Sequence, residues 1–117
     1  FLRPARVAAM RAQARAMLGE AWHMYEAGRV EIARQVAAGH ARLQETRESL
    51  LLYRDKLRPQ ARRTYEAALA GYRGGEVDFL TTIDALLDQQ MIEEQYYRLV
   101  AEHLTAREDL RRAVGGF

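Results

Sequence analysis

The sequence predicts an all-α protein built as one long antiparallel helical hairpin with coiled-coil character. Residues that favour helices, chiefly Ala, Arg, Glu, Leu and Gln, dominate almost the whole chain of 117 residues. Apolar residues recur at seven-residue intervals, which is typical of helices that wind about one another. A pair of glycines, Gly74 and Gly75, interrupts both patterns, so the chain is expected to divide there into two helical arms.

The first arm, residues 1–73, is predicted to be one long helix. Pro4 suits its first turn, because proline lacks an N–H that would be unpaired there in any case. Three apolar lines at intervals of seven or fourteen suggest neighbours on more than one side of this helix. They are Trp22, Val36, Leu43, Leu50 and Leu57; Met10, Met17 and Met24; and Leu18, Tyr25 and Ile32. Pro59 interrupts the arm, and a kink is favoured over a loop because no glycine flanks it.

Residues 74–77 are predicted to form the turn between the arms. Gly74 and Gly75 sit where a helix can end in the left-handed conformation, which glycine adopts without a Cβ clash. Asp78 is placed to accept hydrogen bonds from the first free N–H groups of the next helix. The tip of the hairpin then comprises Tyr72, Arg73, Gly74, Gly75, Glu76, Val77, Asp78, Phe79 and Leu80.

The second arm, residues 78–117, is predicted to return as a helix that ends at Gly115 and Gly116. It carries two apolar stripes rather than one. The first is Phe79, Ile83, Leu86, Tyr97, Val100 and Leu104, and the second is Ile92, Tyr96, Leu99, Ala106 and Leu110. A two-helix hairpin covers only one face of each helix. We therefore expect further helices, from other copies of the chain or from sequence outside it, to cover the rest.

The net charge of +2 is divided unevenly between the arms. Residues 1–73 hold 14 of the 18 Lys and Arg and 7 of the 16 Asp and Glu, a net charge of +7. Residues 74–117 hold the remaining 4 and 9, a net charge of −5. Such arms attract one another when folded together, although two merely solvated faces would show the same division. The acidic arm argues against nucleic-acid binding, which needs an uncovered basic stripe.

Composition and motifs argue against several other classes of protein. The chain has no cysteine, so it has neither disulfides nor a thiolate metal site. No apolar run approaches the roughly 18 residues that span a bilayer as a helix. Without a phosphate loop, nucleophile elbow or metal-ligand motif, we expect no enzyme and no cofactor. The start at Phe1, with no signal segment after it, suggests a mature, trimmed or excised fragment.

The histidines and methionines are expected to be surface or packing residues and not metal ligands. His23 and His40 are seventeen residues apart, which is about 25 Å along a helix. The sulfur atoms of Met10, Met17 and Met24 would lie about 10 Å apart on one helix, so they could share a copper ion only through another chain.

Acidic side chains line one side of the first turns of the second arm. Asp84 and Asp88 are four residues apart, as are Asp78 and Thr82. A helical tip provides no cleft for catalytic carboxylates. The acidic residues form either a solvated face or, if several copies assemble, a charged ring at a pore mouth.

Several segments together resemble the TolC family of outer-membrane efflux proteins in their order and spacing. They are Leu57-Arg58-Pro59-Gln60-Ala61-Arg62, Tyr65-Glu66-Ala67-Ala68-Leu69-Ala70-Gly71-Tyr72-Arg73, Gly75-Glu76-Val77-Asp78-Phe79-Leu80, Leu80-Thr81-Thr82-Ile83-Asp84-Ala85, Tyr96-Tyr97, Ala101-Glu102-His103 and Arg111-Arg112-Ala113-Val114-Gly115. The resemblance covers essentially the whole chain, as the last part of the second of two internal repeats. The chain departs from the family pattern at two places. After Ala85 the family often has Ala-Gln-Arg, and this chain has Leu86-Leu87-Asp88-Gln89-Gln90. At the turn, Gly74 is an unusual residue beside Gly75.

The resemblance implies a homotrimer with a β-barrel in the outer membrane and a helical α-barrel that forms a tunnel across the periplasm. Residues 1–73 would descend from the membrane, 74–77 would form the periplasmic tip, and 78–117 would return. The tip would be the closed entrance and would contact the periplasmic adaptor of a tripartite pump. The pump's inner-membrane transporter would energise efflux of drugs, metals or other small molecules. Tyr72 and Asp84 resemble family positions that hold or line the closed entrance.

The competing hypothesis is a structural coiled-coil or helical-bundle interaction module without a channel role. Periodicity and charge are compatible with either function, because both need helices that associate through several faces.

Overall fold

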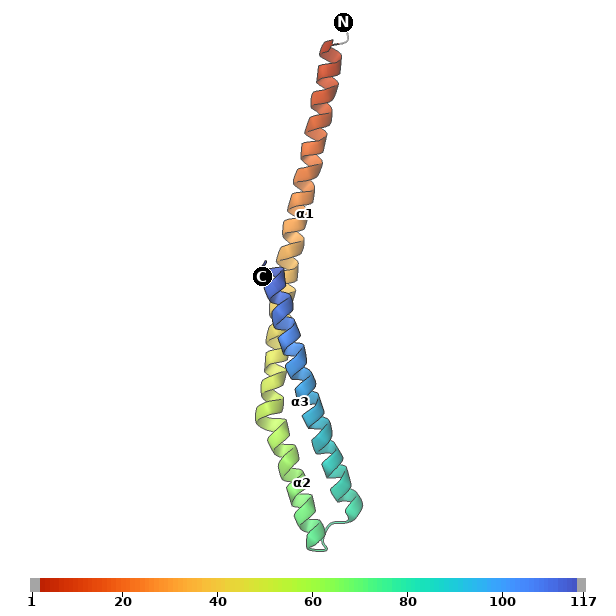
Figure 1. Ribbon diagram of the computed structural model, residues 1–117, viewed down its shortest axis with the longest axis vertical. Helices are drawn as coiled ribbons and strands as arrows, with labels where there is room; N and C mark the ends of the chain where they lie inside the picture. The colour runs from red at the N-terminus through yellow and green to blue at the C-terminus, as the bar shows by residue number, and fades with distance from the viewer. Residues whose placement is uncertain (1–2, 116–117) are drawn as a thin grey trace.

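The computed structural model describes residues 3–115, which are helical except at the turn between the arms and at Val114 and Gly115 (Figure 1). Helix α1 (Arg3–Leu52) continues through a short π-helical segment, η1 (Tyr53–Leu57), into α2 (Arg58–Arg73). After the turn, α3 (Phe79–Ala113) runs back along the chain. The predicted all-α class is therefore confirmed. The expected helix stop at Gly116 lies outside the described residues.

The hairpin is a rod with no globular core. Its extents are 108 × 23 × 18 Å and its radius of gyration is 29.3 Å. A compact domain of this length would have a radius of gyration of about 13 Å. No large side chain is fully buried among residues 3–115. Each arm is covered by the other on one face only.

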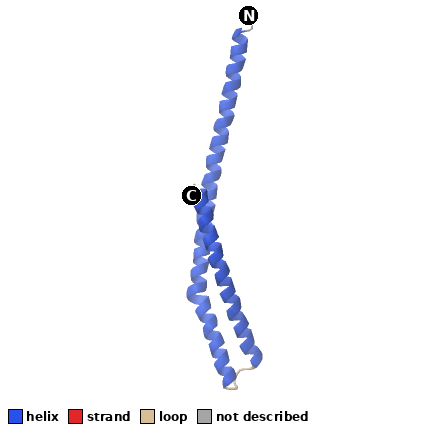
Figure 2. Cartoon of the chain, viewed as in Figure 1, coloured by secondary structure: helices blue, strands red, loops and turns tan. Residues whose placement is uncertain are grey.

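Helix α3 packs against only the C-terminal part of the first arm. Near its end, Leu110 packs against Gly39, where a Cβ would lie 3.1 Å from the Cδ1 atom of Leu110. The absence of a side chain at Gly39 thus allows the two helices to approach closely. The N-terminal part of α1 extends beyond this point without a neighbouring helix (Figure 2).

Small side chains bring the two arms close together. Ala61, Ala85, Leu99 and Ala106 are buried along with two threonines, Thr46 and Thr82. The Thr46 hydroxyl bonds the backbone carbonyls of Arg42 and Leu43 and lies 3.1 Å from Nδ1 of His103. This contact joins α1 to α3 at a buried polar position.

The apolar lines of the sequence divide between covered and uncovered positions. Leu99 and Ala106, from the second stripe of α3, are buried against the first arm. Phe79, Tyr97 and Leu104, from the first stripe, stay exposed. In the first arm the line through Val36, Leu43, Leu50 and Leu57 is half-buried, whereas Trp22 and the Met10, Met17 and Met24 line are exposed.

Helical hydrogen bonding continues past Pro59. The N–H of Arg58 donates to the carbonyl of Tyr53, five residues back, which marks a π-helical turn. Pro59 then occupies the first turn of α2, where its missing N–H is tolerated. The first arm changes direction here (Figure 1), as expected where a π-helical turn and a proline coincide.

Candidate functional site: the hairpin tip and an inter-arm ion pair

A Schellman motif closes the end of α2 at the tip. The N–H of Gly75 donates to the carbonyl of Tyr72 at 3.1 Å, and the N–H of Glu76 donates to the carbonyl of Gly71 at 2.8 Å. Gly75 has a φ of +76°, the left-handed conformation that this motif requires. Gly74 has a φ of −82° and a ψ of −5°, so it is right-handed. The left-handed position expected of the glycine pair falls on Gly75 alone.

Gly71 is a tip residue whose role the sequence reading missed. A Cβ at this position would lie 2.5 Å from Cγ2 of Val77, which is closer than such atoms approach in proteins. The missing side chain lets Val77 fold back over the end of α2, where its N–H also bonds the Gly71 carbonyl at 3.2 Å. The sequence did contain a signal for this role. Gly71 lies four residues before Gly75, at the position whose carbonyl accepts a hydrogen bond in a Schellman motif.

Asp78 caps the start of α3. Its backbone is extended, and its Oδ1 accepts a hydrogen bond from the N–H of Thr81 at 3.0 Å. The neighbouring Thr82 hydroxyl, which is buried, lies 3.4 Å from the carbonyl of Ala68 across the hairpin. The two residues together fix where α3 begins and how it docks on α2.

Lowering the pH should weaken this cap. The pKa of Asp78 lies below its ordinary value of 3.8, because the carboxylate accepts hydrogen bonds from the side chain and the backbone N–H of Thr81. A lowered native pKa means that the cap stabilises the fold fully above the ordinary value, and that this stabilisation is lost as the pH falls through the native value. Between about pH 5 and about pH 2, the Asp78→Asn variant should therefore lose less stability than the wild type, since its amide caps without titrating.

Thermal unfolding followed by circular dichroism at each pH measures this difference. Other carboxylates with lowered pKa values, such as Glu31 at about 2, titrate in both proteins, so the difference between them isolates the cap. Parallel pH profiles for the two proteins would contradict the assigned role.

The remaining tip residues form an exposed and partly aromatic end. The rings of Tyr72 and Phe79 pack across the turn with centroids 5.9 Å apart. Both rings and Leu80 are exposed, as are Arg73 and Glu76. Asp84 is exposed on α3, and none of the interactions described for residues 3–115 joins it to Tyr72. The fold thus packs Tyr72 against Phe79. Tyr72 and Asp84, the two residues predicted to line the pore entrance, are both exposed to solvent.

An ion pair between the arms holds the hairpin at its bend. The Nε atom of Arg58 lies 3.0 Å from both carboxylate oxygens of Glu93, and its Nη2 lies 2.8 Å from Oε2. The guanidinium also stacks on the ring of Tyr96, with Cζ 4.1 Å from the ring centroid. Hydrogen bonding to Glu93 raises the pKa of Arg58 further above its usual range. The sequence analysis did not single out Glu93 as a partner of Arg58.

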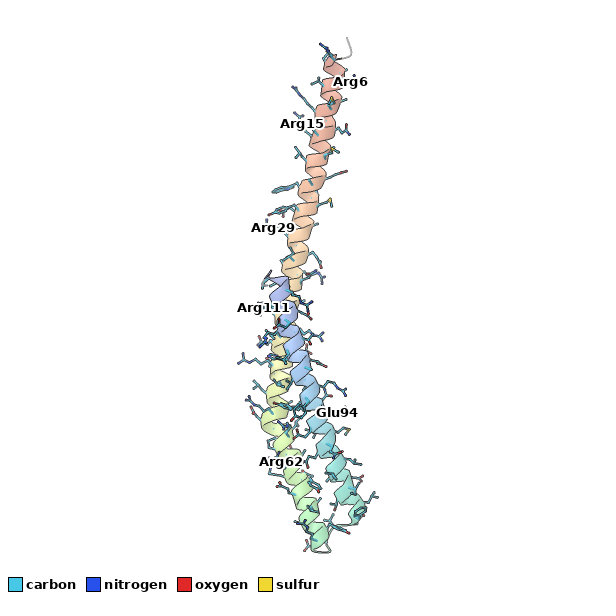
Figure 3. The ribbon with its side chains drawn as sticks, in the orientation of Figure 1. Arg6, Arg15, Arg29, Arg62, Glu94 and Arg111 are labelled. Atoms are coloured by element: carbon cyan, nitrogen blue, oxygen red, sulfur yellow. The ribbon has the colours of Figure 1, made fainter. Side chains whose placement is uncertain are left out.

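Among the ion pairs described for residues 3–115, the one that joins the two arms is that of Arg58 with Glu93. The other ion pairs described between residues 3 and 115 join neighbours on the same helix, such as Arg34 with Glu31 and Arg98 with Glu94. The Arg58–Glu93 pair is therefore a specific contact between the basic arm and the acidic arm. Most charged side chains of both arms are exposed, among them Arg62 and Glu94, which are labelled in Figure 3.

No metal site or membrane span is found in the part of the chain that the structure describes. Residues 3–115 contain no cluster of three or more His, Asp or Glu residues that could hold a metal ion. None of the helices within that range has the length and apolar character needed to cross a membrane.

Comparison with known proteins gives no relative for this hairpin. No family model, no curated protein and no solved structure matches the chain. The tip, the inter-arm ion pair and the exposed faces are therefore the basis for proposing a function.

Proposed function

We propose that this chain is a wall segment of the periplasmic α-helical tunnel of an outer-membrane efflux channel. The observation that carries the proposal is an extended hairpin, 108 Å long, whose apolar residues remain exposed on its outward faces. A rod of this kind is stable in a wall, where neighbouring helices cover those faces. The tip sequence resembles the TolC family, and this resemblance implies that the wall belongs to a homotrimeric α-barrel.

The exposed apolar side chains are the quantitative support for this assembly. Burying one large apolar side chain contributes about 1.5–3 kcal/mol, so a row of them favours association strongly. The N-terminal part of α1 carries nine of the nineteen, namely Val7, Met10, Met17, Leu18, Trp22, Met24, Tyr25, Val30 and Ile32. In the proposed tunnel these residues face adjacent helices of the barrel and not water.

The hairpin tip is the proposed entrance of the tunnel. Asp84 lies six residues beyond the cap residue Asp78, about 9 Å above the tip along α3. In a trimer its three copies form an acidic ring that narrows the closed mouth, and Tyr72 lies nearer the tip. The exposed Phe79 and Leu80 contact the periplasmic adaptor, and the inner-membrane transporter energises passage of the exported molecules.

The alternative is a helical-bundle interaction module without a channel. The same exposed face of α1 supports it, because any helical partner would cover those residues equally well. The two functions differ at Asp84, which approaches its symmetry mates only in a channel.

Cysteine trapping at Asp84 tests the proposed function. The chain has no native cysteine, so an Asp84→Cys variant of the intact outer-membrane protein carries one thiol in this segment. Under mild oxidation we expect disulfide-linked chains within trimers, since the three positions converge near the axis. Glu94→Cys is the matched control, because this exposed residue lies about 15 Å further along α3 and away from the constriction. Equal trapping at both positions, or none at Asp84, would contradict a closed entrance there.

A further inference from the structure

A pocket lies between α1 and α3, next to the contact of Gly39 with Leu110. Its volume is about 610 Å³, which is within the range of small-molecule binding sites. Most of its lining comes from α1 and the rest from the C-terminal half of α3. We call it the histidine pocket, and its polar lining residues are His40, Gln44, Arg47, Glu48, His103 and Arg107.

The spacing of these residues along the two helices brings them together. His40, Gln44 and Arg47 follow one another at intervals of four and three, so they share one face of α1. His103 and Arg107 are four residues apart and share one face of α3 in the same way. Because the hairpin sets these two faces beside each other, polar groups far apart in the sequence converge on one pocket.

The histidine pocket carries positive charge that the chain itself uses little. Two arginines and one glutamate give its lining a net charge of +1 when the histidines are neutral. The Oε1 atom of Glu48 accepts a hydrogen bond from Nε2 of Gln44 at 3.4 Å. None of the ion pairs described for residues 3–115 involves Arg47. Arg107 contacts its neighbour Glu108 at 3.5 Å, and such an exposed pair contributes little. Both guanidinium groups can therefore turn to an anion.

A buried threonine holds His103 in place. The Nδ1 atom of His103 lies 3.1 Å from the hydroxyl oxygen of Thr46, a residue that is only 6% exposed. None of the hydrogen bonds described for residues 3–115 engages the other ring nitrogen, Nε2. An anion in the pocket favours the protonated imidazole, in which both ring nitrogens donate. Nε2 of His103 is thus a donor available to such a ligand.

Two leucines give the pocket an apolar part. Leu43 and Leu51 both line it, the first half-buried and the second 37% exposed. A ligand with an apolar body would remove the exposed surface of Leu51 from water. Positive charge and hydrogen-bond donors beside apolar side chains favour an amphiphilic anion over a neutral molecule or a bare inorganic ion.

We propose that the histidine pocket binds a small organic anion in which one carboxylate or phosphate group is attached to an apolar ring system. Arg47 and Arg107 bind the anionic oxygens from the two arms, and His103 donates to them through Nε2. Leu43 and Leu51 contact the apolar body. A ligand that touches both helices also stabilises the hairpin. This binding site is separate from the tip and does not depend on the proposed channel.

Binding of 1-naphthoate and 1-naphthyl phosphate to the purified chain tests the site, with the neutral 1-naphthamide as the matched ligand. Isothermal titration calorimetry measures the affinities, and the imidazole and guanidinium NMR resonances locate each ligand. We expect both anions to shift the resonances of His103 and Arg47, and the neutral amide to bind about ten-fold more weakly. The anion that binds more tightly identifies the preferred headgroup.

Changing the charge of the pocket should alter the affinity in both directions. Arg47→Gln should weaken binding of the anions about five-fold. Glu48→Gln removes the opposing charge and should tighten binding, a result that a damaged fold would not produce. Arg15→Gln is the matched control, because it removes the same charge from an exposed position on the part of α1 without a neighbouring helix (Figure 3). Circular dichroism checks that the variants remain helical.

Three results would overturn the proposal. Equal affinities for 1-naphthoate and 1-naphthamide would show apolar contact alone. Equal losses for Arg47→Gln and Arg15→Gln would show attraction to the whole chain and not to the pocket. Absence of binding at millimolar ligand would show that no such site exists. None of these results bears on the proposed function, which the Asp84 experiment tests separately.

Discussion

Replacing Arg58 by alanine should lower the free energy of unfolding of the hairpin by about 2 kcal/mol. The change removes a forked ion pair and a cation–π contact, and it leaves the Glu93 carboxylate without its partner. The two side chains are 24% and 27% exposed, so the effect lies between that of a surface pair and that of a buried pair. Urea unfolding monitored by circular dichroism measures the difference.

Two control variants separate this role from a general loss of charge. Arg54→Ala removes an ion pair to the adjacent Asp55, with both side chains 54% exposed, and should change stability little. Arg58→Lys keeps the charge but loses the planar fork, so it should fall between wild type and Arg58→Ala. If Arg54→Ala and Arg58→Ala were equally destabilising, the ion pair across the hairpin would have no special role.

Replacing Gly75 by valine should destabilise the tip by about 2 kcal/mol, because a β-branched residue is strained at a φ of +76°. The two Schellman hydrogen bonds at Tyr72 and Gly71 depend on this conformation, so the end of α2 should fray. Thermal unfolding and amide hydrogen exchange at the tip report the two effects separately.

Gly74→Ala is the matched control for the turn. Gly74 is right-handed, and the nearest atom to a Cβ there is the Ala70 carbonyl oxygen at 3.5 Å, an ordinary contact. The variant should therefore be as stable as the wild type or slightly more stable. A destabilised Gly74→Ala beside an unaffected Gly75→Val would contradict the assigned turn.

Local sequence signals were sufficient to predict the hairpin. The seven-residue apolar lines, the glycine pair and the cap residue Asp78 each act within a few residues of chain, where spacing determines structure. The same signals could not show which of the two glycines is left-handed, because both positions are compatible with a helix end. The hydrogen-bond pattern back to Gly71 and Tyr72 decides it for Gly75.

Features that depend on the register between the two arms could not be predicted from the sequence. The pairing of Arg58 with Glu93 joins residues 35 positions apart, and it follows from where the turn sets α3 against α2. The π-helical turn at Tyr53–Leu57 shifts that register by adding a residue within the first arm. The charge division between the arms was visible in the sequence. The particular charges that pair between the arms required the side-chain positions.

The central claim, that this hairpin forms the gated entrance of an efflux tunnel, is tested most directly by export through the Asp84→Cys protein. Cells that depend on the proposed exporter are loaded with a dye that they export, and the rate of dye efflux is measured before oxidation, after oxidation and after reduction. We expect oxidation to stop efflux by locking the entrance, reduction to restore it, and the Glu94→Cys protein to export throughout. Unchanged efflux from an Asp84→Cys protein whose chains are fully crosslinked would contradict a role of this tip as the gate.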